Sequence, residues 1–232
     1  MHGLEVTWLG HASVRLRTDD GSTYLIDPWL AGNPACPEGE HSQERADAVF
    51  ITHGHFDHVG DSLDVVRKTG APLHAIHEIA VWAGGQGVEA AVGSNKGGTL
   101  TVAGVEATLV HAVHSGGISG EDGIIPGGDP GGWVLAFPGG PTVYHAGDTM
   151  IFGDMALIGE FWEPDIAFLP IGGWYTMGPK QAARAARMLG VEQVVPIHYG
   201  TFPILTGTPE ELAEHGGGAF EVVRMEPGVP IG

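Results

Sequence analysis

Four side chains that can bind a metal ion lie close together in the sequence: His53, His55, Asp57 and His58. The segment that carries them, 48–61, begins with a short apolar run typical of a buried strand and ends where a helix can begin. Imidazole and carboxylate groups together suit zinc or a neighbouring first-row divalent ion. The alternative is that these histidines only fill a polar core, but ionisable groups this close would repel one another or stay unsatisfied without a cation. The spacing therefore predicts a metal site.

Three further segments deliver a metal-ligand type of residue at the end of an expected strand. The run 105–110 leads to His111 and His114, 142–144 leads to Asp148, and 193–197 leads to His198. Strand ends at one edge of a sheet form a rigid scaffold for converging ligands. We expect a pair of ions with the ligands divided as follows: His53, His55 and His114 for one ion, Asp57, His58 and His198 for the other, and Asp148 bridging both.

The elements that must position these residues are short strands, helices and many glycine-bearing loops. Strands are expected at 5–8, 14–17, 23–26, 48–51, 73–76, 99–102, 105–110, 133–137, 142–144, 166–169, 193–197 and 220–225. Helices are expected at 59–69, 77–83, 179–189 and 209–215. We interpret 31–46 as a surface loop and 118–132, which is rich in glycine and acidic residues, as a loop that lies over the site as a lid. Both halves of the chain place strands first and helices after them.

Composition limits the class of protein and its partners. The 232 residues include 10 Lys plus Arg and 28 Asp plus Glu, a net charge of −18, which argues against a nucleic-acid partner. No apolar run approaches the roughly 18 residues of a membrane span. The single cysteine, Cys36, excludes an internal disulfide. The N-terminal residues lack the features of a signal peptide, so we expect a cytoplasmic protein with a single domain over 1–232.

The run from His53 to His58 resembles the His-x-His-x-Asp-His signature of the metallo-β-lactamase superfamily. More narrowly, the chain is similar to the UPF0173 metal-dependent hydrolases, relatives of the lactonases that open ascorbate 6-phosphate. Matching segments are spread over nearly the full length: Trp8–Ala12, Leu25–Pro28, Asn95–Thr99, His114–Ile118, His145–Thr149, Leu169–Gly173, Thr176–Pro179 and Pro196–Thr201. The resemblance implies an αββα sandwich, in which helices flank two mixed β-sheets and two metals lie at one edge.

The resemblance also bears on residues around the expected ligands. The His-Ser-Gly context favours His114 over His111 as a ligand. Asp27 matches a motif aspartate and is expected to orient a ligating histidine rather than to bind metal. For His11, contact with the substrate or the metal rim and simple core packing are equal alternatives. Tyr175 and Thr176 lie on a loop that should face the site, where they would contact the substrate or the metal-binding side chains, although loop aromatics are commonly just packing.

These residues predict a metal-dependent hydrolase. Two divalent ions, with Zn²⁺ first and Mn²⁺ or Fe as alternatives, would activate a hydroxide against a small ester, lactone or related carbonyl substrate. Asp57 is the expected catalytic residue, since it can orient the hydroxide and take its proton. The site charge near +1 suits a small anionic substrate. The alternative is a phosphodiesterase or nuclease of the same superfamily, which the scarcity of Lys and Arg disfavours. A redox di-iron protein would carry a carboxylate in place of His55, and oligomerisation is left open.

Overall fold

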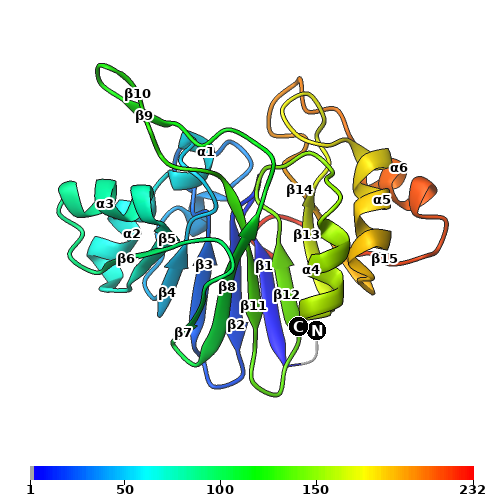
Figure 1. Ribbon diagram of the computed structural model, residues 1–232, viewed down its shortest axis with the longest axis horizontal. Helices are drawn as coiled ribbons and strands as arrows, with labels where there is room; N and C mark the ends of the chain where they lie inside the picture. Colours follow the sequence, from blue (N-terminus) through cyan, green and yellow to red (C-terminus); the bar gives the residue numbers. More distant parts are fainter. Residues whose placement is uncertain (1–2) are drawn as a thin grey trace.

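The computed structural model describes residues 3–232, and it contains two seven-stranded mixed sheets stacked between two groups of helices (Figure 1). Helices α1, α2 and α3 lie beside the first sheet, and α4, α5 and α6 lie beside the second. The αββα sandwich predicted from the sequence is therefore confirmed. The order of strands is β16-β1-β2-β3-β4-β5-β6 in the first sheet and β15-β14-β13-β12-β11-β8-β7 in the second.

The bounds of the elements follow the predicted pattern closely. The first sheet contains β1 (Leu4–Trp8), β2 (Val14–Thr18), β3 (Thr23–Ile26), β4 (Ala48–Phe50), β5 (Leu73–Ile76), β6 (Ala91–Ser94) and β16 (Pro230–Ile231). The second contains β7 (Thr99–Val102), β8 (Val105–His111), β11 (Gly131–Ala136), β12 (Thr142–His145), β13 (Ile166–Pro170), β14 (Gln193–Ile197) and β15 (Glu221–Val222). The helices are η1 (Glu38–Glu40), α1 (Phe56–Val59), α2 (Ser62–Thr69), α3 (His77–Gly85), α4 (Met155–Trp162), α5 (Pro179–Leu189) and α6 (Pro209–Gly216).

The two halves of the chain share one plan. In the first half, β1, β2 and β3 pair antiparallel, and β3 to β6 then pair in parallel. In the second half, β7, β8, β11 and β12 pair antiparallel, and β12 to β15 then pair in parallel. Strands β1, β3 and β4 therefore share one direction within their sheet, and so do β8, β12 and β14. Every loop with a candidate site residue follows one of these six strands, except the loop with Tyr175 and Thr176, which follows β13.

Apolar side chains explain why the layers stack. One buried cluster fills the space between the sheets and includes Leu16, Phe50, Trp133 and Phe168. A second cluster lies under the helices of the second half, where α5 presents a face of small residues such as Ala182 and Ala186. Small side chains let this helix approach the sheet closely. The core thus holds the sheet edges, and the loops that follow them, in fixed relative positions.

The structure differs from the predicted elements in several places. The expected helix at 59–69 begins later, at Ser62, and α1 before it ends at Val59. The chain turns between them because Gly60 adopts a φ of +37° and a Cβ there would lie 2.6 Å from the Trp29 Cα. The expected lid loop at 118–132 contains a hairpin, β9 (Ile118–Gly120) and β10 (Gly123–Ile125), which projects from the body (Figure 1). The strand expected at 220–225 is shorter, since β15 contains only Glu221 and Val222. Four elements were not predicted from the sequence: β6, η1, α4 and β16. No helix within residues 3–232 is long and apolar enough to span a bilayer.

Candidate metal centre

The loops that follow β4, β8, β12 and β14 bring the predicted ligand residues together at one edge of the sandwich. Candidate ligand atoms form two neighbouring groups, within each of which they lie no more than 4.8 Å apart. The first group is His53, His55, His114 and Asp148, and the second is His11, Asp57, His58 and His198. The three histidines that were predicted to hold one ion lie in the first group with Asp148, and the three side chains predicted for the other ion lie in the second group with His11. A third group, Asp27, His53 and His58, overlaps these two.

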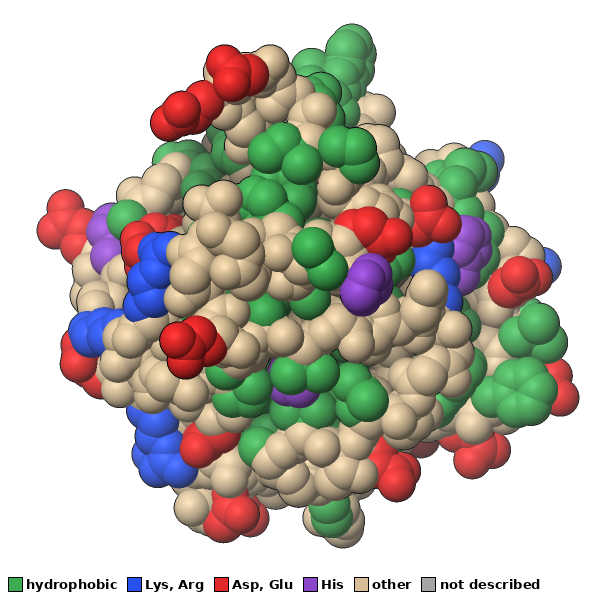
Figure 2. Space-filling model, turned by 60° about the vertical axis from the view of Figure 1, so that its left-hand side comes forward, with side chains coloured by type: hydrophobic (Ala, Val, Ile, Leu, Met, Phe, Trp, Pro, Cys, Tyr) green, Lys and Arg blue, Asp and Glu red, His purple; other side chains and the backbone are tan. Residues whose placement is uncertain are grey.

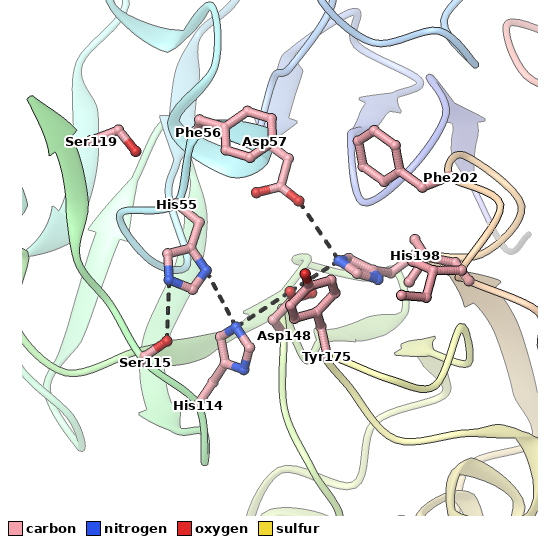
Figure 3. A pocket seen from close by; sticks show the side chains of 12 residues that line it. His55, Phe56, Asp57, His114, Ser115, Ser119, Asp148, Tyr175, His198 and Phe202 are labelled. Carbon is pink, nitrogen blue, oxygen red and sulfur yellow. Dashed lines mark hydrogen bonds and ion pairs between the residues drawn. The ribbon is translucent and has the colours of Figure 1, made fainter. Parts of the chain in front are cut away.

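Three imidazole nitrogens converge in the first group. His55 Nδ1 lies 3.0 Å from His53 Nε2 and 3.3 Å from His114 Nε2. His114 Nε2 also lies 3.5 Å from Asp148 Oδ2. The second ring nitrogen of His55, Nε2, lies 3.2 Å from the Ser115 Oγ (Figure 3). The site-facing atoms are therefore acceptor nitrogens and a carboxylate oxygen, which is the donor set that a divalent metal ion requires.

Asp148 connects the two groups. Its Oδ2 lies 3.0 Å from His198 Nε2, and its Oδ1 lies 3.3 Å from His58 Nε2. Asp57 lies on the other side of His198, with 3.9 Å between Asp57 Oδ2 and His198 Nε2. Figure 3 shows His114, Asp148 and His198 in succession across the base of the site. Asp148 thus occupies the central position that was predicted for a bridging carboxylate.

The hydrogen bonding fits a metal ion better than it fits a closed polar core. His58 Nε2 and Asp148 Oδ1 are buried without a hydrogen-bond partner. Burial alone disfavours a charged His58, yet Asp148 and Asp27 raise the pKa of its imidazole well above 6.5. Burial is also the main reason that the pKa of His53 lies well below 6.5, so this ring is neutral. The cluster combines neutral imidazoles with carboxylates that favour a positive charge between them, which is the environment of a bound cation.

Asp27 and Thr52 fix the tautomers of two histidines. His58 Nδ1 donates to Asp27 Oδ2 at 2.7 Å, so its Nε2 is the ring nitrogen that faces Asp148 and that a metal ion would bind in place of a proton. The Thr52 hydroxyl donates to the same Asp27 oxygen at 2.6 Å and can therefore only accept from His53 Nδ1, at 3.0 Å. His53 Nε2 therefore carries no proton, and its lone pair points toward the site. Asp27 lies where the sequence analysis expected it, whereas the role of Thr52 was missed, although it directly precedes His53.

His11 is fully buried and contacts the site from beneath. Its Nε2 lies 3.1 Å from Asp57 Oδ2, and its Nδ1 lies 3.0 Å from Thr201 Oγ1. Burial lowers the pKa of His11 to about 4, against the hydrogen bond to Asp57. Burial of Asp57 favours its neutral form, but the hydrogen bond from His11 prevails and holds the pKa of this carboxyl at about 2. His11 is therefore both part of the buried interior and in contact with Asp57.

Backbone strain is concentrated at these loops. His11, Asp27 and His198 have φ values of +54°, +47° and +53°, a region that residues with a Cβ rarely occupy. Such conformations cost about 1–3 kcal/mol and persist where the surrounding structure enforces them, commonly at functional sites. Gly147, just before Asp148, has a φ of +59°, and a Cβ there would lie 2.7 Å from the Thr52 Cβ. The fold therefore maintains a strained but defined geometry around the candidate ligands.

A pocket of about 600 Å³ opens above the two groups. Tyr175 lines it, whereas Thr176 does not line it and its hydroxyl bonds the Met177 carbonyl oxygen. No residue of the 31–46 segment lines it, and His111 is exposed with its Nδ1 3.3 Å from Lys96 Nζ. The sequence analysis missed several lining residues: Phe56, Ser115, Ser119, Phe202, Ile204 and Leu205. The only sequence signal for the last three was their position in the irregular segment that follows His198.

The charge on the surface is mainly negative. Acidic side chains are spread over the face shown in Figure 2, and the Lys and Arg side chains there lie in separate groups rather than in one continuous patch. Most basic residues are paired with acids, as in Arg15 with Glu40, Arg67 with Asp64 and Arg224 with Glu210. Among residues 3–232, no Lys or Arg lines the pocket above the two groups. The charge distribution is unlike that of a nucleic-acid-binding surface.

Comparison with known proteins agrees with the fold. The family model described as the beta-lactamase superfamily domain matches residues 22–199. UPF0173 metal-dependent hydrolases from Koribacter versatilis and Rubrobacter xylanophilus are 49% and 50% identical to this chain, covering 98% and 99% of it and 97% of each relative. The structure of the metallo hydrolase Igni18 from Ignicoccus hospitalis superposes with a TM-score of 0.86 at 39% identity, covering 98% of this chain and 97% of that one. The chain belongs to the UPF0173 metal-dependent hydrolases of the metallo-β-lactamase superfamily.

Proposed function

We propose that the protein uses two divalent metal ions to hydrolyse a small ester, lactone or related carbonyl compound. The observation that carries the proposal is the pair of His/Asp groups joined by Asp148 at the base of an open pocket. His53, His55 and His114 would hold one ion, Asp57, His58 and His198 would hold the other, and Asp148 would contact both. Zn²⁺ is the first choice because imidazole ligands predominate, and Mn²⁺ and Fe are the alternatives.

Divalent ions at such a site lower the pKa of water toward neutrality and polarise the oxygen of the group under attack. The protein itself contributes by directing the lone pairs of the imidazole nitrogens toward the positions of the ions. Thr52 and Asp27 hold His53 and His58 in the tautomers that direct Nε2 into the site. The same two contacts fix the ring orientations, so little reorganisation is needed when the ions bind.

Asp57 has the position of a catalytic residue. It lines the pocket, and its Oδ2 accepts a hydrogen bond from His11. With a pKa of about 2, the carboxylate is ionised across the neutral range and is available to orient a water molecule and accept its proton. His11 acts through Asp57 as a positioning residue, because it is buried beneath the carboxylate and does not line the pocket.

Turnover by metal-loaded protein on two kinds of substrate tests this proposal. The protein is loaded separately with Zn²⁺, Mn²⁺ or Fe²⁺, and each form is assayed on small lactones and aryl esters and on bis(p-nitrophenyl) phosphate. Hydrolysis of esters or lactones that a chelator abolishes and metal restores is the expected result. Metal-dependent cleavage of the phosphodiester alone would assign the protein to the phosphodiesterases of the superfamily.

A further inference from the structure

The pocket above the two His/Asp groups has an apolar wall with a defined internal structure. Phe56 and Phe202 both line the pocket and flank Asp57 (Figure 3). Trp29, which is buried, packs against both rings. Its ring centroid lies 5.7 Å from that of Phe56 and 5.9 Å from that of Phe202. The Trp29 ring also meets the edge of His11, with centroids 5.2 Å apart. The apolar wall is therefore packed against the same buried residues that position Asp57.

The rim of the pocket exposes apolar surface that nothing in the described chain covers. Phe56, Tyr175 and Ile204 line the pocket and remain 56%, 63% and 39% exposed. Trp174, next to Tyr175, is 75% exposed and has a φ of +58°, so the loop is held in a strained conformation that presents both aromatic rings to solvent. Large apolar side chains gathered at the mouth of a polar site are typical of a surface that a ligand buries.

The absence of basic side chains from the pocket lining, among residues 3–232, also indicates an uncharged ligand. Apart from Tyr175, the ionisable side chains that line the pocket all belong to the two His/Asp groups, and no guanidinium or ammonium group within residues 3–232 lines it to bind a phosphate or a carboxylate in addition to the proposed ions. The hydroxyls of Ser115, Ser119 and Tyr175 are the remaining polar groups of the lining. The net charge of −18 would also repel an anion as it approaches.

We infer that the substrate is an uncharged ester or lactone with an apolar group, an aryl or medium-length acyl chain, that packs on the wall of Phe56 and Phe202 while its carbonyl lies over Asp148. This inference rests on the proposed function, and it replaces an anionic or phosphorylated substrate by a neutral one. The carbonyl would be attacked by water and the acyl–oxygen bond would break, which gives a carboxylic acid and an alcohol from an ester and a single hydroxy acid from a lactone. Burial of each added methylene on the wall stabilises the transition state as well as the bound substrate.

A series of p-nitrophenyl esters with one leaving group and a varied acyl group tests the inference in the metal-loaded protein. From acetate through butyrate to hexanoate, kcat/KM should rise about threefold for each methylene. The p-nitrophenyl monoester of adipate has the same chain length as the hexanoate but ends in a carboxylate, and its kcat/KM should be at least about tenfold lower. The variant Phe202→Ala should flatten the acyl series, and Phe202→Leu should restore part of the slope.

The matched control is Phe161→Ala, which removes an equally large ring that is 70% exposed on α4 and does not line the pocket. It should keep the slope of the wild-type series. A flat series with chelator-sensitive turnover, or an adipate monoester cleaved as well as the hexanoate, would overturn the inference and leave the proposed function intact. If no ester or lactone is cleaved in a metal-dependent way, the proposed function fails and the inference fails with it.

Discussion

Asp27 and His58 form a fully buried pair in which His58 Nδ1 lies 2.7 Å from Asp27 Oδ2. Asp27 Oδ1 accepts the backbone N–H of Thr52 at 2.8 Å, and Oδ2 also accepts the Thr52 hydroxyl. One carboxylate therefore fixes the end of β4, the tautomer of His58 and, through Thr52, the tautomer of His53. Since Asp27 does not line the pocket above the two groups, its effect on the chemistry is expected to pass through these two histidines.

The variant Asp27→Asn should lower metal occupancy and turnover by about 10- to 100-fold while the protein still folds, since outer contacts of this kind tune metal affinity. Asparagine tolerates the left-handed backbone of this position, which has a φ of +47°, better than other replacements. Metal content per chain and kcat at saturating metal measure the effect, with the exposed Asp64→Asn as control. Wild-type metal content in Asp27→Asn would show that the carboxylate does not orient the ligand.

His58→Ala and Asp148→Ala test the division of the ligands. His58 belongs to one group and Asp148 contacts both, so His58→Ala should remove one ion and Asp148→Ala should weaken both. Each variant should lose nearly all turnover but keep its circular dichroism spectrum. Metal analysis after dialysis, at matched free metal concentration, gives the number of ions per chain. Full activity in either variant would contradict the two-metal arrangement.

His74, which belongs to neither of the two His/Asp groups, makes stability dependent on pH. It is buried on β5 against Phe50, neither ring nitrogen has a partner, and burial lowers its pKa to about 4. In the unfolded chain the pKa is 6.5, so below pH 6.5 the unfolded state binds more protons and stability falls until the pH reaches about 4. The variant His74→Phe should reduce this loss by about 2 kcal/mol, after allowing for partial solvation.

Chemical denaturation at pH 7 and at pH 4.5 measures the contribution of His74. The difference in the free energy of unfolding between the two pH values should be smaller in His74→Phe than in the wild type. The exposed His77→Leu, three residues away, should leave the difference unchanged. An equal pH dependence in wild type and His74→Phe would mean that this imidazole takes up its proton in the folded protein without cost.

Gly147→Ala and Gly139→Ala separate backbone strain from close approach. Both glycines have a positive φ, +59° and +68°, but only at Gly147 would a Cβ collide with a neighbour, the Thr52 side chain. Gly139→Ala should cost about 1 kcal/mol of stability. Gly147→Ala should cost about 1–3 kcal/mol more and should also reduce metal content, because Asp148 follows directly. Equal effects of the two substitutions on stability and metal content would refute the close-approach explanation.

The positions of the candidate ligand residues could be predicted because they depend on local pattern. Apolar β-branched runs followed by His or Asp identify β4, β8, β12 and β14, and the family motifs supply the sandwich that brings their ends together. The break between α1 and α2 could not be predicted, because it depends on the contact of Gly60 with Trp29, which is distant in sequence. Helix α4 was missed because it is apolar on most sides, contains Gly159 and lacks a side-chain cap at Asp154.

The apolar wall could not be predicted from the sequence either, because it also depends on contacts between residues that are distant in sequence. Phe56, Phe202 and Trp29 come from three separate segments, and nothing in their spacing links them. The hairpin of β9 and β10 was hidden by its glycine-rich and acidic composition, which is typical of an irregular loop. The cytoplasmic location, the single-domain organisation and the lid role of the 118–132 segment stay predictions.

The candidate centre draws on both halves of the chain, with His53, His55, Asp57 and His58 from the first half and His114, Asp148 and His198 from the second. Neither half alone supplies the full set of ligands proposed for either ion, so tight binding of the proposed ions would require the two sheets to have docked. A folding chain would therefore acquire its metal ions late. The ions would stabilise the two sheets once they have docked and would not initiate folding. The time course of metal uptake during refolding would then record the docking of the two sheets.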